Sequence, residues 1–288
     1  MSEKQYRDSL FRHYFSDKIR LLSLVNALIG TDATDPNELE INTIDGSFST
    51  DIRNDISCLF RNRFLVLIEQ QSTVNQNMPA RFLFYLAELM KKIVGDHTQF
   101  YRRRLIEFPE PEFFVIYNGL KSGGNRTEMR LSEAFHNSKN IELVAKFIDV
   151  REGQNEELLR RSEYLTNYCV FVNRVMQNTK NGMQLSAAIQ ETQDYCIRNG
   201  VMSEYLREHY WEVAKLYIIE YDREKMARMA HEDGVAEGRE EGLAKGREQE
   251  RLVLIKNLLN AGTPIKYIEA ATGWSEEQIL ASIKSELH

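Results

Sequence analysis

The sequence predicts a mixed α/β fold of the α+β type, followed by a helical half. Three observations predict it. The chain opens with apolar residues spaced near 3.6, several short runs rich in Ile, Leu, Val and Phe follow, and the pattern is helical again over residues 155–231. The 288 residues are 42% hydrophobic and 28% charged, which is the balance of an ordinary globular protein.

The first half of the chain is expected to combine two helices with five short strands. Gly30 stands where the cap of the first helix belongs, and Pro79 lies in the first turn of the second. Asp-Gly and Arg-Asn-Arg separate the first three strands, which look like a meander. In chain order the expected elements are a helix at 8–29, strands at 38–45, 51–60 and 63–71, a helix at 77–94, and strands at 112–120 and 141–150.

The changes of pattern divide the chain into four parts. These are a mixed core at 1–150, a helical subdomain at 151–231, a charged segment at 232–251 and a small helical tail at 252–288. In the charged segment glycine recurs every four residues, and on a helix these glycines would form one narrow stripe. Each glycine would destabilise the helix by roughly 1 kcal/mol relative to alanine. Two interpretations stay open: a dimerising helix whose partner packs on the stripe, or a solvated linker.

The tail contains residues that typically start and end helices, and their spacing predicts three short helices. Gly262 and Gly273 end the first two, Thr263 and Pro264 open the second as cap and first position, and a capping box opens the third at Ser275. Two short helices joined by a glycine turn are typical of a helix-turn-helix. However, the second of them begins Ser-Glu-Glu, which does not suit contact with phosphates. We therefore expect a protein-interaction module, and homo-oligomers formed through the C-terminal helices.

The composition and the first residues limit the class of protein to which the chain can belong. No apolar run approaches the ~18 residues of a membrane span, and the opening residues lack the apolar core of a secretory signal. Cys58, Cys169 and Cys196 are scattered without a CxxC, and the histidines have no metal-ligand spacing. These features predict a cytoplasmic protein with buried thiols. The net charge of −6 disfavours non-specific nucleic-acid binding, although a local basic rim would suffice for a nuclease.

Two carboxylates mark the ends of the second and third strands. If Arg61-Asn62-Arg63 is a three-residue loop, Asp55 faces Glu69. Opposed side chains have Cβ atoms about 4.5–5.5 Å apart, and like charges so placed are destabilising. With nothing cationic opposite, the pair predicts a hard divalent ion such as Mg²⁺, and Gln71 projects from the same face. The alternative, ordinary strand-end acids that a longer loop puts out of register, stays open.

The segments NDIS, FLVLIEQQST and MPARFLFYLAEL, in this order, resemble the recombination-promoting nuclease family, also described as putative transposases, of the PD-(D/E)XK nuclease superfamily. The opening DSLFRHYFSDKIRLLSLVNALIG, the strand FFVIYNGL and the glycine-repeat tail before IEAATGWSEEQI are also similar to family features. The resemblance therefore covers essentially the whole chain. It implies a helix-β-β-β-helix-β core, metal-dependent hydrolysis of DNA phosphodiester bonds, and a link to recombination or mobile-element DNA.

The resemblance also implies roles for particular residues. Asp55 matches the aspartate of the PD motif and Glu69 the acid of (D/E)XK, so both would bind Mg²⁺, with Mn²⁺ or Ca²⁺ as alternatives, assisted by the backbone carbonyl of Gln70. Gln71 occupies the lysine position. Asp8 matches an acidic residue on the first helix of the family and would complete the site or hold a second metal ion.

Two positions depart from the motif. Asn54 replaces the proline, which costs little because that residue mainly shapes the strand. Gln71 replaces the lysine, and an amide can position a water by hydrogen bonding but carries no charge. The departure leaves an alternative function, a catalytically weak or inactive nuclease-fold protein that acts as an interaction and assembly module.

Two groups of arginines are candidate DNA contacts. Arg81 stands in the first turn of the helix at 77–94, where a guanidinium and backbone N–H groups would meet a phosphate. Arg102, Arg103 and Arg104 form the densest basic cluster and are candidates for tracking the DNA backbone. In both places the alternative is solvated surface charge.

Overall fold

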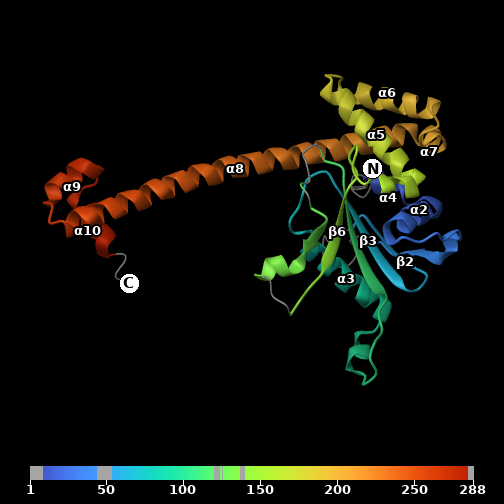
Figure 1. The fold of residues 1–288 in the computed structure, drawn as a ribbon, viewed down its shortest axis with the longest axis horizontal. Helices are drawn as coiled ribbons and strands as arrows, with labels where there is room; N and C mark the ends of the chain where they lie inside the picture. Colours follow the sequence, from blue (N-terminus) through green and yellow to red (C-terminus); the bar gives the residue numbers. More distant parts are fainter. Residues whose placement is uncertain (1–8, 44–53, 120–123, 125, 137–139, 285–288) are drawn as a thin grey trace. The chain divides into compact units, whose positions relative to one another are not determined.

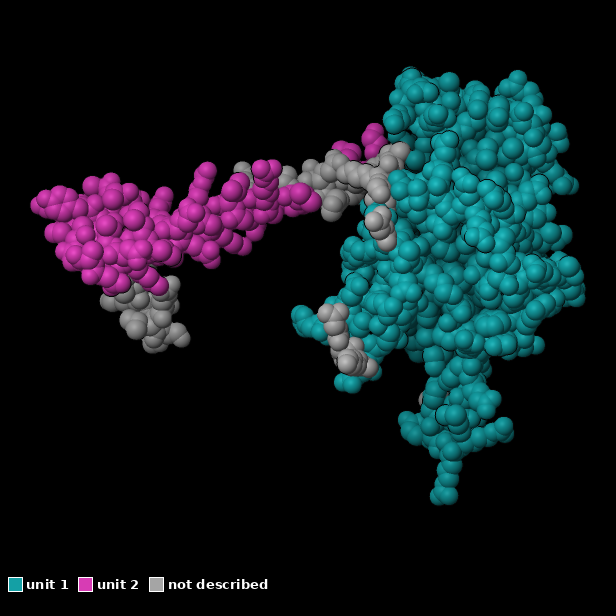
Figure 2. Space-filling model, viewed as in Figure 1, with its two compact units in different colours: residues 1–224 teal, residues 225–288 magenta. Residues whose placement is uncertain are grey.

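The protein is described by a computed structural model that covers residues 9–43, 54–119, 124, 126–136 and 140–284. It forms two compact units, Met1–Glu224 and Lys225–His288, which Figure 2 colours separately. The first unit holds a six-stranded mixed sheet with helices, which confirms the expected mixed α/β class (Figure 1). None of the helices in the described ranges combines the length and apolar character that a membrane span requires.

The sheet of the first unit has the strand order β1-β2-β3-β4-β6-β5. Strands β1 to β3 form an antiparallel meander, β3 pairs in parallel with β4 and β4 with β6, and β5 is antiparallel to β6. Strand β5 is not predicted from the sequence, because three residues are too few to show an alternating pattern. The strands are β1 Leu39–Ile41, β2 Ile56–Phe60, β3 Phe64–Gln71, β4 Glu110–Tyr117, β5 Glu128–Arg130 and β6 Val144–Asp149.

The opening of the chain corrects one prediction. The single helix expected at 8–29 is instead two, α1 (Leu10–Tyr14) and α2 (Lys18–Ile29). The break arises because the side chain of Asp17 accepts hydrogen bonds from the backbone N–H groups of Ile19 and Arg20 and so starts a new helix. Gly30 caps α2 in the left-handed conformation with φ 86°, as expected.

Helices occupy both faces of the sheet and the second half of the unit. After α3 (Met78–Val94) the chain forms α4 (Glu156–Arg161), α5 (Glu163–Lys180), α6 (Leu185–Arg198), α7 (Ser203–Glu208) and the start of α8 (Tyr210–Asn260). Within the described residues, the short 3-10 helices η2 (Pro36–Glu38), η3 (His97–Tyr101) and η4 (Leu131–Phe135) join the other elements. The helical pattern expected from residue 155 onward is therefore confirmed.

Strand β3 is buried on both sides, which explains its unbroken apolar sequence. Val66 and Ile68 belong to a core shared with α1, α2 and the helices from α5 to α8. Leu65 and Leu67 point the other way and pack with α3. One hydrophobic core thus joins the sheet to residues 165–217, so the helical segment and the sheet are parts of one unit.

The second unit begins within α8 and ends with two short helices, α9 (Ile265–Thr272) and α10 (Glu276–Lys284). Ile255, Ile268 and Ile279 form its small core. The charged glycine-repeat segment lies inside α8, so its glycines do share a helix. Apart from the adjacent residues and the backbone of the helix itself, no described atom lies within 4 Å of a Cβ built on any of these four glycines, Gly234, Gly238, Gly242 and Gly246.

The boundaries in the tail differ from the prediction in two places. The first of the three expected short helices is the end of α8. Pro264 precedes α9 instead of occupying its first position, and α9 has no side-chain cap. The capping box of α10 is confirmed, because Gln278 N–H donates to Ser275 Oγ (3.3 Å) and Ser275 N–H donates to Gln278 Oε1 (3.0 Å).

Candidate functional site

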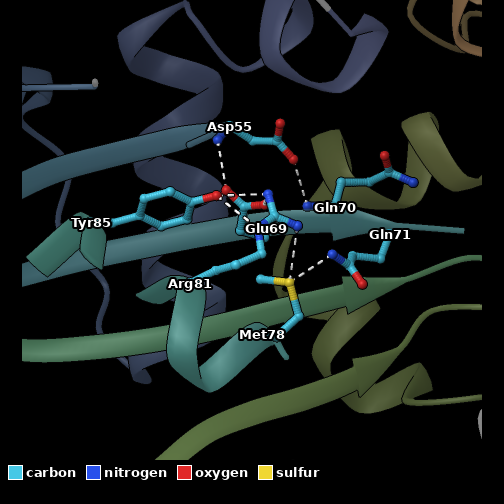
Figure 3. Close-up of polar contacts among 7 residues, drawn as sticks. All are labelled: Asp55, Glu69, Gln70, Gln71, Met78, Arg81 and Tyr85. Carbon is cyan, nitrogen blue, oxygen red and sulfur yellow. Dashed lines mark hydrogen bonds and ion pairs between the residues drawn. The ribbon is translucent and has the colours of Figure 1, made fainter. Parts of the chain in front are cut away.

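The hairpin of β2 and β3 brings the two predicted carboxylates together. Ile56 pairs with Ile68 and Phe60 with Phe64, which is the register expected from the sequence. Asp55, directly before β2, therefore lies beside Glu69. Its backbone N–H donates to Glu69 Oε1 (3.0 Å), and its own Oδ2 accepts from the backbone N–H of Gln70 (2.8 Å), as Figure 3 shows.

The pleat of β3 decides which way Glu69 points. Successive side chains alternate between faces, so Glu69 and Gln71 share the face of Leu65 and Leu67, which is covered by α3. The side chain of Glu69 is only 3% exposed. A carboxylate buried this deeply requires a partner, because an unpaired charge in a protein interior is costly.

That partner is Arg81, which lies in the first turn of α3. Its Nη2 lies 2.8 Å from Glu69 Oε2, and its Nε and Nη2 donate to the hydroxyl of Tyr85 (2.9 and 2.6 Å; Figure 3). The premise that nothing cationic faces the carboxylates is therefore wrong, since the packing of α3 on the sheet brings Arg81 to Glu69. The Arg81 side chain is 39% exposed, so the guanidinium is held by a buried carboxylate yet still reaches solvent.

Gln71, in the position of the motif lysine, belongs to the same cluster. Its side-chain amide nitrogen lies 2.7 Å from Met78 Sδ (Figure 3). When the amide oxygen and nitrogen are exchanged, the nitrogen donates to Thr73 O (3.0 Å) and the oxygen accepts from Arg81 Nη1 (3.2 Å). The exchanged orientation is favoured, because it turns an acceptor instead of a donor toward the guanidinium. Gln71 thus helps to hold Arg81.

Gln70 connects the hairpin to the end of β4. Its side-chain Nε2 donates to Asn118 Oδ1 (2.7 Å), and Asn118 N–H donates to the backbone oxygen of Gln71 (3.1 Å). A Cβ on Gly119 would collide with the backbone oxygen of Ser72 and the ring of Tyr117. The Asn-Gly pair that follows β4 therefore has a packing reason to contain glycine.

The electrostatics of the cluster reflect burial and crowded negative charge. Burial and, next, the charge of Asp55 raise the pKa of Glu69 to about 8, against the opposing effects of Arg81 and of the Asp55 N–H. Burial lowers the pKa of Arg81, but its interactions with Glu69 and Tyr85 outweigh this and raise it overall. Burial also raises the pKa of Tyr85. Burial, with a further contribution from Asp55, therefore makes Glu69 harder to ionise than an ordinary glutamate despite its contact with Arg81.

Of the remaining predicted site residues, those that the structure describes are not brought to the pair. Asp8 lies outside the described residues. Arg102, Arg103 and Arg104 are exposed and follow η3, ahead of β4. Residues 102–104 precede Glu110, which starts β4 and pairs with Phe64 at the start of β3. Glu69 lies near the other end of β3, so the three arginines precede the opposite end of these strands (Figure 1).

Neither Tyr85 nor Met78 is among the site residues predicted from the sequence, although both contact those residues. The available signal was the i, i+4 spacing of Arg81 and Tyr85, which places them on one side of α3. Together the cluster offers hard oxygen donors beside a permanent cation. Such an arrangement can hold a divalent ion, or it can serve as an internal ion pair.

Comparison of the chain with protein-family models, with curated proteins and with solved structures gives no significant match. The resemblance drawn from the sequence segments therefore stays an interpretation of those segments. Any function assigned to the chain rests on that interpretation and on the geometry of the β2–β3 hairpin.

Proposed function

We propose that the protein is a metal-dependent DNA endonuclease that hydrolyses phosphodiester bonds at Asp55 and Glu69. The observation that carries the proposal is the hairpin register, which sets Asp55 next to Glu69, so that the Asp55 N–H donates to the buried Glu69 carboxylate and the Asp55 carboxylate accepts from Gln70 N–H. The order of helices, three strands, helix and strand supports the same interpretation, because it is the order that a PD-(D/E)XK core requires. DNA linked to recombination or mobile elements is the proposed substrate, and the cytoplasm the proposed location.

The donor set fits a hard divalent ion. Asp55, Glu69 and the backbone carbonyl of Gln70 would supply oxygen ligands, which suit Mg²⁺, with Mn²⁺ or Ca²⁺ as alternatives. The raised pKa of Glu69 supports a cation requirement, since it arises in part from the uncompensated charge of Asp55. When bound, such an ion lowers the pKa of a coordinated water and stabilises charge on a phosphoryl oxygen.

Arg81 and Gln71 have complementary roles in this proposal. Without metal, the guanidinium contacts Glu69 and keeps its carboxyl group in place. Its exposed edge lets it contact a substrate phosphate once Glu69 is otherwise compensated. Gln71, which contacts Arg81, orients the attacking water by hydrogen bonding. Arg102, Arg103 and Arg104 would contact the DNA backbone beyond the site, because they precede Glu110, which lies about 17 Å along β4 from Val115, the residue that pairs with Glu69.

A second candidate function has its own supporting observation. Arg81 already supplies the cation that a metal would provide, and Gln71 carries no charge. A nuclease-fold protein that has lost most of its activity would look the same and would act as an interaction module. Homo-oligomers formed through the C-terminal helices belong to either function, with the small core around Ile255, Ile268 and Ile279 organising that region.

Cleavage of supercoiled plasmid with Mg²⁺ or Mn²⁺ tests the proposal. The proteins compared are the wild type, Asp55→Asn and Glu69→Gln, with Glu128→Gln as a matched control on the exposed part of β5. We expect nicking by the wild type and the control, and a loss of about 100-fold or more in the two site variants. Equal activity in Glu69→Gln and Glu128→Gln would refute the site. No nicking by any protein would favour the interaction module.

A further inference from the structure

We propose that His13, His209 and Glu212 form a second site, which binds one transition-metal ion, with Zn²⁺ as the expected occupant. The three residues come from α1, from the position directly before α8 and from the first turn of α8, and all belong to the first unit. One ligand atom of each lies within 4.8 Å of the others. The site shares no residue with the Asp55 and Glu69 pair and is independent of the proposed nuclease activity.

The distances between these ligand atoms are close to those of a coordination sphere. His13 Nε2 lies 3.6 Å from Glu212 Oε1, and His209 Nδ1 lies 3.1 Å from Glu212 Oε2. Ligands bound tetrahedrally at about 2.0–2.1 Å from Zn²⁺ are roughly 3.3 Å apart from one another. Small side-chain rotations would therefore be enough for the three donors to meet on one ion.

His13 also has a neighbour suited to orient its second ring nitrogen. His13 Nδ1 lies 2.7 Å from the hydroxyl of the buried Tyr205, which can accept a hydrogen bond from Nδ1–H and leave the Nε2 lone pair for the metal ion. Such an outer partner fixes the tautomer and orientation of a metal-binding histidine.

The donor set selects the kind of metal. Two imidazoles and one carboxylate suit Zn²⁺ and its neighbours in the first transition series, whereas Mg²⁺ prefers oxygen donors only. The side chains are partly exposed, at 26% for His13, 34% for His209 and 54% for Glu212, so an ion can enter and a water can fill the remaining position. Bound metal would join α1 to the start of α8, two segments far apart in sequence.

The sequence does not reveal this cluster, for a definite reason. His13 and His209 have no short spacing, and His209 to Glu212 is an i, i+3 pair that only the packing of α1 completes. The competing explanation is a hydrogen-bonded cluster of His13, His209 and Glu212 that takes no metal.

Metal binding by the full chain, without an affinity tag and stripped with a chelator, separates the two explanations. Zn²⁺ affinity is measured by competition with a chromophoric chelator, and geometry by the visible absorption of added Co²⁺. We expect one Zn²⁺ per chain and the intense absorption of four-coordinate Co²⁺. His209→Asn and Glu212→Gln should abolish both signals, and Tyr205→Phe should weaken Zn²⁺ binding by about tenfold or more.

Matched controls make the result decisive. His136→Asn and Glu204→Gln change the same residue types at exposed positions outside the cluster and should bind as the wild type does. Glu69→Gln should leave the Co²⁺ spectrum unchanged, which assigns the signal to this cluster and not to the hairpin. Absence of stoichiometric Zn²⁺, or equal affinity in His209→Asn and His136→Asn, would overturn the proposal.

Discussion

Glu69 and Glu212 show two ways in which this protein neutralises a carboxylate. Glu69 is buried and faces Arg81, whose positive charge is permanent. Glu212 is half exposed and faces His13 and His209, which can be neutral ligands or cations. Burial accounts for the difference between the two partners. The buried Glu69 has a cation fixed in the fold even without a bound metal ion, whereas the charge of the neighbours of the exposed Glu212 depends on protons.

Removing the built-in cation should have the largest effect on stability. Arg81→Met leaves Glu69 buried without its ion pair, so we expect the free energy of unfolding at pH 8 to fall by about 2–3 kcal/mol in urea denaturation. Arg160→Met is the control, because Arg160 pairs with Glu156 on the surface, where an ion pair contributes about 0.5 kcal/mol or less. Equal losses in the two variants would remove the distinction between buried and exposed pairs.

The pH dependence of stability sharpens the comparison. The pKa of Glu69 is about 8 in the folded protein against 4.5 for an ordinary glutamate. Between these values the folded state binds more protons than the unfolded chain, so the unfolding free energy falls as pH rises. The unfolding free energies of Glu69→Gln and the wild type are compared in the presence of a chelator. As the pH rises from 5 to 8, the difference between them should shift by roughly 1–3 kcal/mol in favour of Glu69→Gln. A difference that stays constant over this range would contradict the raised pKa.

Tyr85→Phe should give a smaller loss. It removes the hydroxyl that accepts two hydrogen bonds from Arg81 and leaves the ring in place, so we expect about 1 kcal/mol in the same denaturation experiment. In the double variant Tyr85→Phe with Arg81→Met, the loss of unfolding free energy should be less than the sum of the two single losses, because both substitutions remove the same contacts. Additive losses would show that Tyr85 and Arg81 act separately.

The smallest effect is expected at the exposed carboxylate. With metal removed by a chelator, Glu212→Gln should change the unfolding free energy by no more than about 0.5 kcal/mol, because Glu212 is in contact with solvent. Thermal unfolding of the variant beside the wild type measures this. A loss as large as that of Arg81→Met would mean that the cluster of His13, His209 and Glu212 is a structural network in its own right.

These two sites also show what can be predicted from sequence. The register of Asp55 and Glu69 follows from a short loop and a side-chain period of two, both of which are local properties. The role of Arg81 does not, because it depends on how α3 packs across the sheet. The same is true of His13, which meets Glu212 only through tertiary packing. In α1 and α2 the apolar spacing predicts one helix, and the cap formed by Asp17 overrides it.

Binding of Mn²⁺, followed by electron paramagnetic resonance, tests the central claim most directly. The His209→Asn variant serves as background, so that the second cluster does not contribute. We predict one Mn²⁺ per chain in this background, tighter binding when Arg81→Met removes the competing guanidinium, and loss of binding in Glu69→Gln. Equal Mn²⁺ binding with and without Glu69→Gln would contradict a metal site on the β2–β3 hairpin.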